Sequence, residues 1–221
     1  MPMAFRAVMI MLCLFVSFFS RAQAPDSTSF RAHVLGISTN LAFDATYVPN
    51  YGFTSVPNLS IEFYPNRGHY TFGADFDCPM WKHPEQHKYL QANNLTLWAR
   101  RYFKPEPGRY NGAYLLASAN AVRYGIGWNF KGWQGEGLGA SLGAGYKFSL
   151  GKRLFLDLGG SLGFFYSGYD PYVWGNDATE RYYYDYAGKP SDFIPRNKRL
   201  SWFGPTRLYI SLGVDLFTRK K

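Results

Sequence analysis

Residues 138–149 read Leu-Gly-Ala-Ser-Leu-Gly-Ala-Gly-Tyr-Lys-Phe-Ser, and every large apolar side chain in this stretch falls on one parity. Successive side chains of a β-strand point to opposite faces, so the leucines, alanines and both aromatic residues share one face. The other face carries only Gly, Ser and one Lys. The same alternation returns in residues 154–166 and 208–216. The pattern predicts strands with one apolar face and one face of small polar residues.

Small residues on the second face decide between two classes of β protein. Glycine and serine suit the crowded interior of a narrow barrel, whereas the water-exposed surface of a soluble protein usually carries many Lys, Glu and Thr. We therefore expect an all-β fold: a transmembrane antiparallel up-and-down β-barrel of about eight strands. The alternative is a soluble secreted barrel or sandwich with the apolar side inside, because its strands alternate equally well.

Eight alternating segments can be counted, joined by links that are short and long in turn. The expected strands are residues 33–43, 56–64, 70–78, 95–103, 114–124, 138–148, 154–166 and 206–217. The short links are 65–69, 104–111 and 149–153, and the long ones are 44–55, 79–94, 125–137 and 167–205. Outer-membrane barrels have this asymmetry, with short periplasmic turns and long extracellular loops.

Aromatic residues at the ends of the expected strands predict two girdles at the membrane interfaces. Those at the periplasmic ends are Phe63, Tyr64, Tyr102, Phe103, Tyr146, Phe148 and Phe217. Those at the outer ends are Tyr124, Trp128, Phe164, Tyr166, Trp202 and Phe203.

The N-terminus has the three-part layout of a secretory signal peptide. Arg6 precedes an apolar stretch over residues 7–19, and small residues follow it. The predicted location is therefore the outer membrane of a Gram-negative cell. The expected division is a signal peptide over residues 1–22, with cleavage after Ala24 as the alternative, an N-terminal extension over 23–32, the barrel over 33–217 and a basic tail over 218–221.

The chain carries a formal net charge of +9, which in another setting would indicate nucleic acid. We do not expect nucleic acid as a partner, because the predicted signal peptide would export the chain from the cytoplasm. Outer-membrane lipids and anionic lipopolysaccharide are the expected complement of the positive charge.

Charges of both signs lie on the small-residue parity. The interior of an eight-stranded barrel is only wide enough for side chains, and enclosed charges are costly unless they are paired. We expect a network of ion pairs and hydrogen bonds to fill the lumen, and a small pore lined by acids is the alternative. The acidic members are Glu62, Asp75, Asp77, Asp157 and Asp215, and the basic members are Lys147, Arg123 and either Arg100 or Arg101.

The sequence predicts no catalytic residue, no metal site and no cofactor. The run His83-Pro84-Glu85-Gln86-His87 differs from the His-Glu-x-x-His zinc signature, and Pro84 argues against the required helix. A lipid A-modifying hydrolase of the outer leaflet is the alternative function. It needs a nucleophile and a base together on the outer wall, but His33 and His69 fall near the periplasmic ends.

The longest link, residues 167–205, is the expected working surface. Tyr and Trp give a large contact area with a polar tip, which suits binding of a protein or a sugar. We expect a non-enzymatic structural or surface-interaction role, with this loop binding a surface protein or a glycan. The alternative is a lid formed by its acidic and basic halves. The candidate partner-binding residues are Tyr169, Tyr172, Trp174, Tyr182, Tyr183, Tyr184, Tyr186, Arg196, Lys198 and Arg199.

Several short motifs occur in an order that resembles one family. They are Asn40-Leu41 with Asp44-Ala45-Thr46 and Pro49-Asn50, Trp81-Lys82-His83, Leu150-Gly151-Lys152-Arg153, Tyr169-Asp170 with Tyr172, and Trp202-Phe203-Gly204-Pro205-Thr206 with Ile210-Ser211-Leu212. With these motifs the sequence resembles an uncharacterised family of Bacteroidota-type outer-membrane β-barrel proteins, catalogued as a domain of unknown function. The resemblance implies a barrel and a surface-assembly context, because members often accompany fimbrial components. No catalytic residue is established for that family, so the resemblance implies none here.

Overall fold

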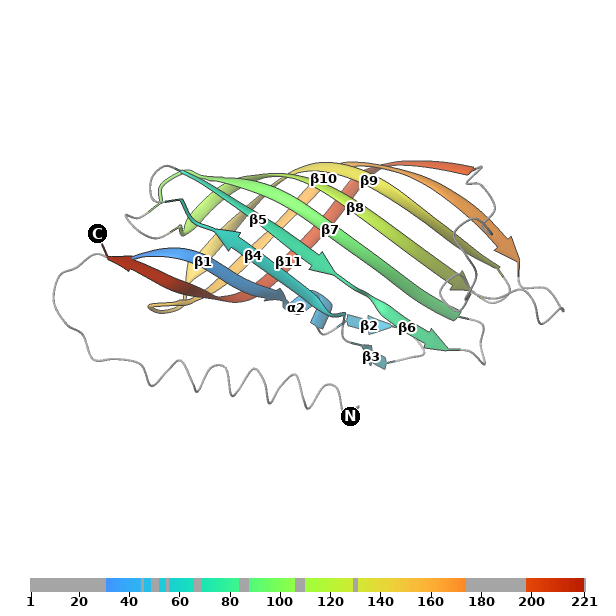
Figure 1. Cartoon of the computed structure of the whole chain (residues 1–221), viewed down its shortest axis with the longest axis horizontal. Coiled ribbons are helices and arrows are strands. Elements are labelled where there is room, and N and C mark those ends of the chain that lie inside the picture. The colour runs from blue at the N-terminus through green and yellow to red at the C-terminus, as the bar shows by residue number, and fades with distance from the viewer. Residues whose placement is uncertain are drawn as a thin grey trace.

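A computed structural model describes most of the chain after residue 30, and nearly all of the described residues lie in antiparallel strands (Figure 1). No helix among them is long and apolar enough to cross a membrane. The described residues are 31–44, 46–48, 52–54, 56–65, 69–83, 88–105, 110–128, 131–173 and 198–220.

The strands form one up-and-down sheet whose pairings return to their starting point. The order is β5-β4-β1-β11-β10-β9-β8-β7-β6, and β5 also pairs with β7, so the sheet is ring-like. We call this arrangement the strand ring. Its strands are β1 (Arg31–Asn40), β4 (Asn58–Phe63), β5 (Tyr70–Asp77), β6 (Met80–His83), β7 (Lys88–Tyr102), β8 (Gly112–Trp128), β9 (Lys131–Ser149), β10 (Leu154–Val173) and β11 (Lys198–Lys220).

The sheet contains nine strands where about eight were expected. The extra strand arises because β5 and β6 are successive segments that both pair with β7. They are separated at Cys78 and Pro79. Pro79 has no N–H to donate to a ladder, and its carbonyl accepts the Ala92 N–H at 2.9 Å.

A short helix and a small hairpin follow β1. Helix α2 (Leu41–Asp44) leads into a separate two-stranded sheet of β2 (Thr46–Val48) and β3 (Gly52–Thr54). Thr39 Oγ1 and Asn58 Nδ2 hold the Asp44 carboxylate at 2.7 and 2.8 Å, which fixes the helix against the ends of β1 and β4.

The two walls of the strand ring differ in height (Figure 1). The strands β7 to β11 contain 15 to 23 residues, and we call them the tall wall. The strands β1, β4 and β5 contain 10, 6 and 8 residues, and we call them the short wall. At one end of the ring, β8 to β11 therefore extend beyond β1 and β4, and we call this the projecting end. The opposite end is the turn end, where residues 64–69, 103–111 and 150–153 join neighbouring strands.

The short links were predicted correctly, but three of the long ones were wrong in extent. In the link predicted over 167–205, residues 167–173 belong to β10 and residues 198–205 to β11. Residues 88–94 belong to β7, and β8 pairs with β9 up to the Trp128–Lys131 pair, leaving two residues between these strands. Residues 125–137 are rich in glycine and suggest a loop. Their backbone groups nevertheless pair with neighbouring strands on both sides, and this pairing requires no particular side chain.

The seam between β1 and β11 joins the first and last strands. It runs from the Arg31–Lys220 pair to the Asn40–Ser211 pair, so residues 218–220 of the expected basic tail lie in β11. Beyond the last pair, the Asn40 side chain takes the place of a strand partner. Its Nδ2 donates to the Leu208 carbonyl at 3.3 Å, and its Oδ1 accepts the Ile210 N–H at 3.1 Å.

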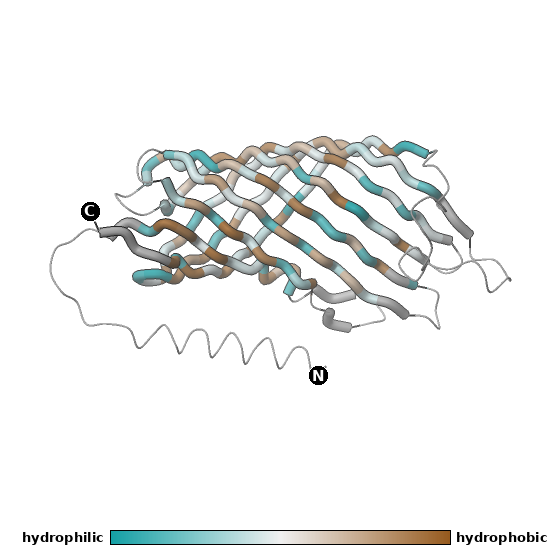
Figure 2. The backbone as a smooth tube through the Cα atoms, viewed as in Figure 1, coloured by the Kyte–Doolittle hydropathy of each residue, from teal (hydrophilic) through white to brown (hydrophobic). Residues whose placement is uncertain are grey.

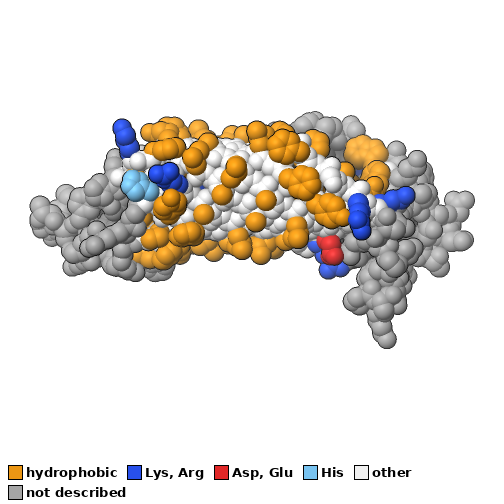
Figure 3. All heavy atoms as spheres, turned by 90° about the horizontal axis from the view of Figure 1, so that it is seen from above, with side chains coloured by type: hydrophobic (Ala, Val, Ile, Leu, Met, Phe, Trp, Pro, Cys, Tyr) orange, Lys and Arg blue, Asp and Glu red, His pale blue; other side chains and the backbone are white. Residues whose placement is uncertain are grey.

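The outer face of the strand ring is apolar along most of its height. Large hydrophobic side chains point outward with exposed fractions such as 72% for Leu142, 67% for Leu208 and 58% for Leu162. Figure 2 shows hydrophobic and hydrophilic residues alternating along the strands, and Figure 3 shows a hydrophobic belt with charged residues near both ends. The parity predicted for residues 138–149 is confirmed.

Four of the predicted girdle residues lie on the inner face of the strand ring instead: Tyr64, Tyr102, Tyr124 and Trp202. Tyr64 and Tyr102 are 3% and 0% exposed, and the Tyr124 hydroxyl hydrogen-bonds Ser167 at 2.8 Å. Phe63 and Phe103, the neighbours of Tyr64 and Tyr102 on the opposite parity, carry exposed rings. The girdle residues that are exposed on the outer wall are Phe63, Phe103, Tyr146, Phe148, Trp128, Phe164, Tyr166 and Phe203, whereas Trp202 is 51% exposed on the inner face.

Candidate functional site

The lumen of the strand ring is filled near the turn end by a buried ionic network, which we call the charged core. Its centre is Glu62 on β4, which is 4% exposed. Glu62 accepts hydrogen bonds from Lys147 Nζ at 2.9 Å, Thr71 Oγ1 at 2.6 Å and Tyr102 Oη at 3.1 Å, and Arg100 lies at 3.4 Å. Two cations and two hydroxyls thus compensate one buried carboxylate.

Arg100 on β7 links Glu62 to a second carboxylate. Its other terminal nitrogen lies 2.7 Å from Asp157 on β10, which also accepts the Tyr114 hydroxyl at 2.6 Å. The guanidinium packs against the rings of Trp98 and Tyr114, with centroid distances of 4.1 and 4.5 Å. Ion pairing, hydrogen bonding and cation–π contact therefore hold Arg100 in one position.

Lys147 on β9 extends the network toward the turn end. Its ammonium group also hydrogen-bonds Tyr64 Oη and lies 3.8 Å from the Phe155 ring centroid. Tyr64 in turn donates to Asp215 at 2.7 Å. These contacts connect the short wall and the tall wall across the lumen.

Tyr110 covers the charged core from the turn end. Its ring stacks on Tyr64 at 5.5 Å, and its hydroxyl donates to the Pro65 carbonyl at 2.8 Å. Burial is the main cause that raises the pKa of Tyr110, and the nearby Glu62 carboxylate adds to it. The phenol therefore stays neutral and keeps its donor proton at physiological pH.

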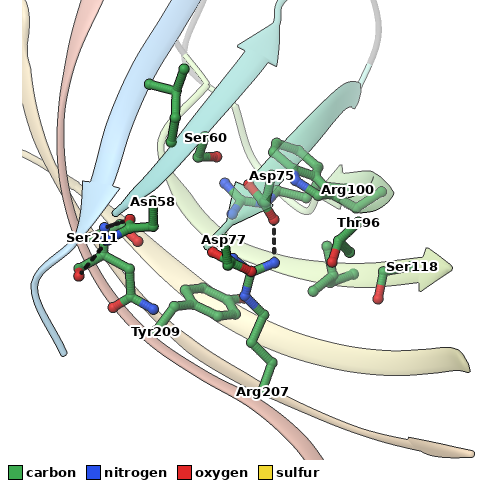
Figure 4. Close-up of a pocket in the computed structure, with 14 residues that line it drawn as sticks. Asn58, Ser60, Asp75, Asp77, Thr96, Arg100, Ser118, Arg207, Tyr209 and Ser211 are labelled. Carbon is green, nitrogen blue, oxygen red and sulfur yellow. Dashed lines mark hydrogen bonds and ion pairs between the residues drawn. The ribbon is translucent and has the colours of Figure 1, made fainter. Parts of the chain in front are cut away.

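A second ionic group lies next to the charged core, on its side toward the projecting end (Figure 4). Arg207 on β11 pairs with Asp75 and lies 3.6 Å from Asp77, both on β5, while Asn94 Nδ2 donates to Asp77 at 2.9 Å. The enclosed space beside this group, lined also by Arg100, is about 20 Å³, room for about one water molecule. The middle of the lumen is therefore packed.

Glycines on the inner face make room for the large rings of the lumen. A Cβ added to Gly159 would lie 2.4–2.7 Å from the Tyr209 ring and hydroxyl, and one added to Gly73 would lie 2.2 Å from Trp98. Each such glycine lies on a strand next to the one that carries the ring. The same relation holds for Gly36 with Tyr64, Gly145 with Tyr114, Gly137 with Phe165 and Gly213 with Phe155.

The predicted ionic filling of the lumen is confirmed for most of the named residues. Arg100 is the inward arginine of its pair, whereas Arg101 is exposed. Arg123 is also exposed, so its predicted place in the lumen was wrong. Arg207 was missed, although it has the same parity as Asp215 in β11 and could have been found from that spacing.

The structure places few of the predicted partner-binding residues. Tyr169 is half-buried near the end of β10 and pairs with Lys198, and Lys198 and Arg199 are exposed at the start of β11. Tyr172 belongs to β10, and its side chain is not described. The residues outside the described part of the chain are Trp174, Tyr182, Tyr183, Tyr184, Tyr186 and Arg196.

The histidines are dispersed. His33 Nε2 lies 3.9 Å from Asp215, and His69 Nδ1 contacts the Tyr102 carbonyl at 2.9 Å, both near the turn end. His83 ends β6, and residues 84–87 lie outside the described part. Within the described ranges, no three His, Cys, Asp or Glu side chains gather as they would around a metal ion.

Comparison with known proteins gives one match. No curated protein and no solved structure matches the chain. A family model described as "Protein of unknown function (DUF3575)" matches residues 8–214. The resemblance to an uncharacterised family is confirmed, while its bacterial group and fimbrial association stay predictions. Since the match covers the signal-like segment and almost all of the strand ring, the chain belongs to the DUF3575 family of proteins of unknown function.

Proposed function

We propose that this chain is a transmembrane β-barrel of the outer membrane, with a closed lumen and a non-enzymatic structural or surface-interaction role. The observation that carries the proposal is the inversion of polarity across one wall. On β9, Leu138 and Leu142 are 67% and 72% exposed, whereas Lys147 is 2% exposed. An apolar exterior around a charged interior is stable in lipid and unfavourable in water.

Packing of the lumen favours a closed barrel over a small pore. The charged core connects β4, β7, β9 and β10, and its charges already compensate one another. A permeating ion would have to displace paired groups such as Arg100 and Asp157, which is costly in a narrow lumen. In planar bilayers we expect no stable conductance steps from the purified protein. Steps of uniform size would support the pore and contradict the closed barrel.

The projecting end is the surface that we assign to partner binding. It places Lys198 and Arg199 in the open at one end of the tall wall, where cations favour lipopolysaccharide phosphates. Tyr169 and the aromatic residues that follow β10 supply contact area for a surface protein, including a fimbrial protein, or for a glycan. The fimbrial context follows from the resemblance stated above.

A deletion of residues 174–197 tests this role of the projecting end. It removes the connection but keeps the pairing of β10 with β11, because these strands pair up to Tyr169 and Lys198 and Asp170–Val173 are left to form the new turn. We expect a heat-modifiable barrel that no longer cross-links to its partner on intact cells. A Lys152→Ala variant in an exposed link at the turn end is the control and should keep the partner. A partner that survives the deletion would contradict the loop proposal.

The alternative of a lipid A-modifying enzyme is less well supported. The two fully described histidines, His33 and His69, lie at the turn end, away from the expected outer leaflet. Lipid A masses should therefore be the same in wild-type and knockout cells. A mass difference restored by complementation would favour the enzyme.

A further inference from the structure

A second, larger space lies in the lumen between the Arg207 ion pairs and the projecting end. Its volume is about 240 Å³, and side chains from β5, β7, β8, β9, β10 and β11 line it. One part of its lining consists of hydroxyls and amides, including Ser118, Ser141, Asn94 and Asn120. The other part consists of aromatic rings, among them Phe165 and Trp202.

A β-bulge brings Trp202 into this cavity. On β10 and β11, Ser161 pairs with Arg207 but Leu162 pairs with Pro205, so Thr206 is the extra residue. Between the bulge and the turn end, odd-numbered residues of β11 such as Arg207 face the lumen. Between the bulge and the projecting end the parity is reversed, and Trp202 lies opposite the inward Phe165. Bulges that re-aim a side chain are common next to binding sites.

Small residues give both aromatic rings their space. A Cβ on Gly204 would lie 2.8 Å from the Trp202 ring, and a Cβ on Gly137 would lie 2.5 Å from the Phe165 ring. The neighbouring Phe203 is 77% exposed on the outer wall. One aromatic residue of this pair is therefore turned inward and the other outward.

The polar part of the lining is ordered before any ligand arrives. Asn120 Nδ2 donates to Asn94 Oδ1 at 3.1 Å, and Asn94 Nδ2 donates to Asp77 Oδ2 at 2.9 Å. Asp77 is 6% exposed, and its Oδ1 is buried and accepts no hydrogen bond among the groups that the structure describes, although Arg207 Nη2 lies 3.6 Å away. This oxygen is an acceptor for a ligand hydroxyl, since a buried polar atom gains free energy when it is satisfied.

We propose that this cavity binds one neutral sugar ring, a pyranose. Amide, hydroxyl and carboxylate groups suit the hydroxyls of a sugar, and the Trp202 and Phe165 rings suit its apolar C–H face. The ligand is neutral because Arg207 is already paired with Asp75 and Asp77. The volume of about 240 Å³ is that of several water molecules, which leaves room for one sugar ring.

Saturation-transfer difference NMR on the full mature chain in detergent micelles tests the proposal. The probes are the methyl pyranosides of glucose, galactose, mannose and N-acetylglucosamine, each at about 20 mM. We expect transfer to at least one of them, with the strongest signals on the ring protons. If none of the four receives transfer from the wild-type protein, the proposal is wrong and the cavity holds water only.

Two variants and a matched control locate the binding. Trp202→Ala removes the inward ring and should weaken binding about fivefold or more, whereas the outward Phe203→Ala should leave it unchanged. Ser141→Leu fills the cavity and should abolish transfer. Equal binding by Ser141→Leu and the wild type would overturn the assignment. Should a variant fail to become heat-modifiable, the wild-type panel decides alone. The cavity lies inside the strand ring and outside residues 174–197, so the result of the sugar-binding experiment does not depend on the result of the loop deletion.

Discussion

Glu62 and Lys147 form a 2.9 Å ion pair between strands that are four positions apart in either direction around the strand ring. The pair therefore spans the lumen and braces two opposite walls. Both side chains are almost fully buried, at 4% and 2% exposure. A buried pair of this kind contributes most visibly when one partner is removed, because the other charge is then uncompensated.

Lys147→Met should destabilise the folded protein by about 3 kcal/mol. The carboxylate of Glu62 keeps Arg100 but loses its closest cation. Urea unfolding in lipid vesicles, followed by the heat-modifiable gel shift, gives the free energy of unfolding. Lys152→Met in an exposed link is the control and should change it by less than about 0.5 kcal/mol. Adding Glu62→Gln to Lys147→Met should recover part of the loss, and a further full-sized loss would contradict the assignment.

Gly159 and Gly160 are adjacent on β10 and provide a test of the packed lumen. Gly159→Ala places a methyl group against the Tyr209 ring and should cost about 1–3 kcal/mol. Gly160→Ala meets only the Arg207 carbonyl at 3.3 Å and Leu208 at 3.9 Å and should be nearly neutral. The same unfolding assay measures both. Equal effects of the two substitutions would show that the inner face is not close-packed at this level.

Leu142→Arg tests whether the apolar belt faces lipid. An arginine on the lipid face near mid-height should cost about 2–4 kcal/mol and reduce the amount of assembled protein in the outer membrane. Leu150→Arg, in the link between β9 and β10, should have little effect, because that link lies at the turn end. Improved solubility with normal stability of Leu142→Arg would instead indicate a protein surrounded by water.

The orientation of the strand ring can be read by cysteine labelling on intact cells. Cys78 is first replaced by Ser, and one new cysteine is placed at position 129 or 152, next to opposite ends of the ring. A membrane-impermeant maleimide should label Asn129→Cys and spare Lys152→Cys until the cells are lysed, because short turns are expected to face the periplasm. Labelling with the reverse preference would place the projecting end in the periplasm.

The sequence predicted the strands best where one face is buried against other side chains. Alternation in residues 138–149 gave both the strand and its two faces, because Leu and Gly occupy opposite parities without exception. In β7 the pattern was ambiguous, since Leu97 and Trp98 are both apolar. The structure resolves it by burying Trp98 beneath Arg100 and turning Leu97 outward. Trp98 and Arg100 lie on the same face of β7, two residues apart, so the parity of Trp98 follows from that of the inward arginine, which the sequence left open between Arg100 and Arg101.

Two other differences come from contacts between strands. The upper part of β9 looks like a loop because of its glycines, but the pairing with β8 and β10 makes it a strand. The inward position of Trp202 depends on the single extra residue Thr206, and a bulge cannot be read from alternation in one strand. The neighbouring strand sets the register at such places, and the periodicity of a single strand does not reveal it.

The seam between β1 and β11 has a consequence for how the protein is made. The other pairings in the ring join strands that lie near one another along the chain, whereas the seam joins Leu35 to Leu216. Hairpins between neighbouring strands need only part of the chain, but the ring can close only once the last strand is present. Until then β1 and the growing edge offer unpaired backbone groups that attract other chains. A copy that lacks β11 would therefore expose two strand edges, those of β1 and β10, which are paired in the complete ring.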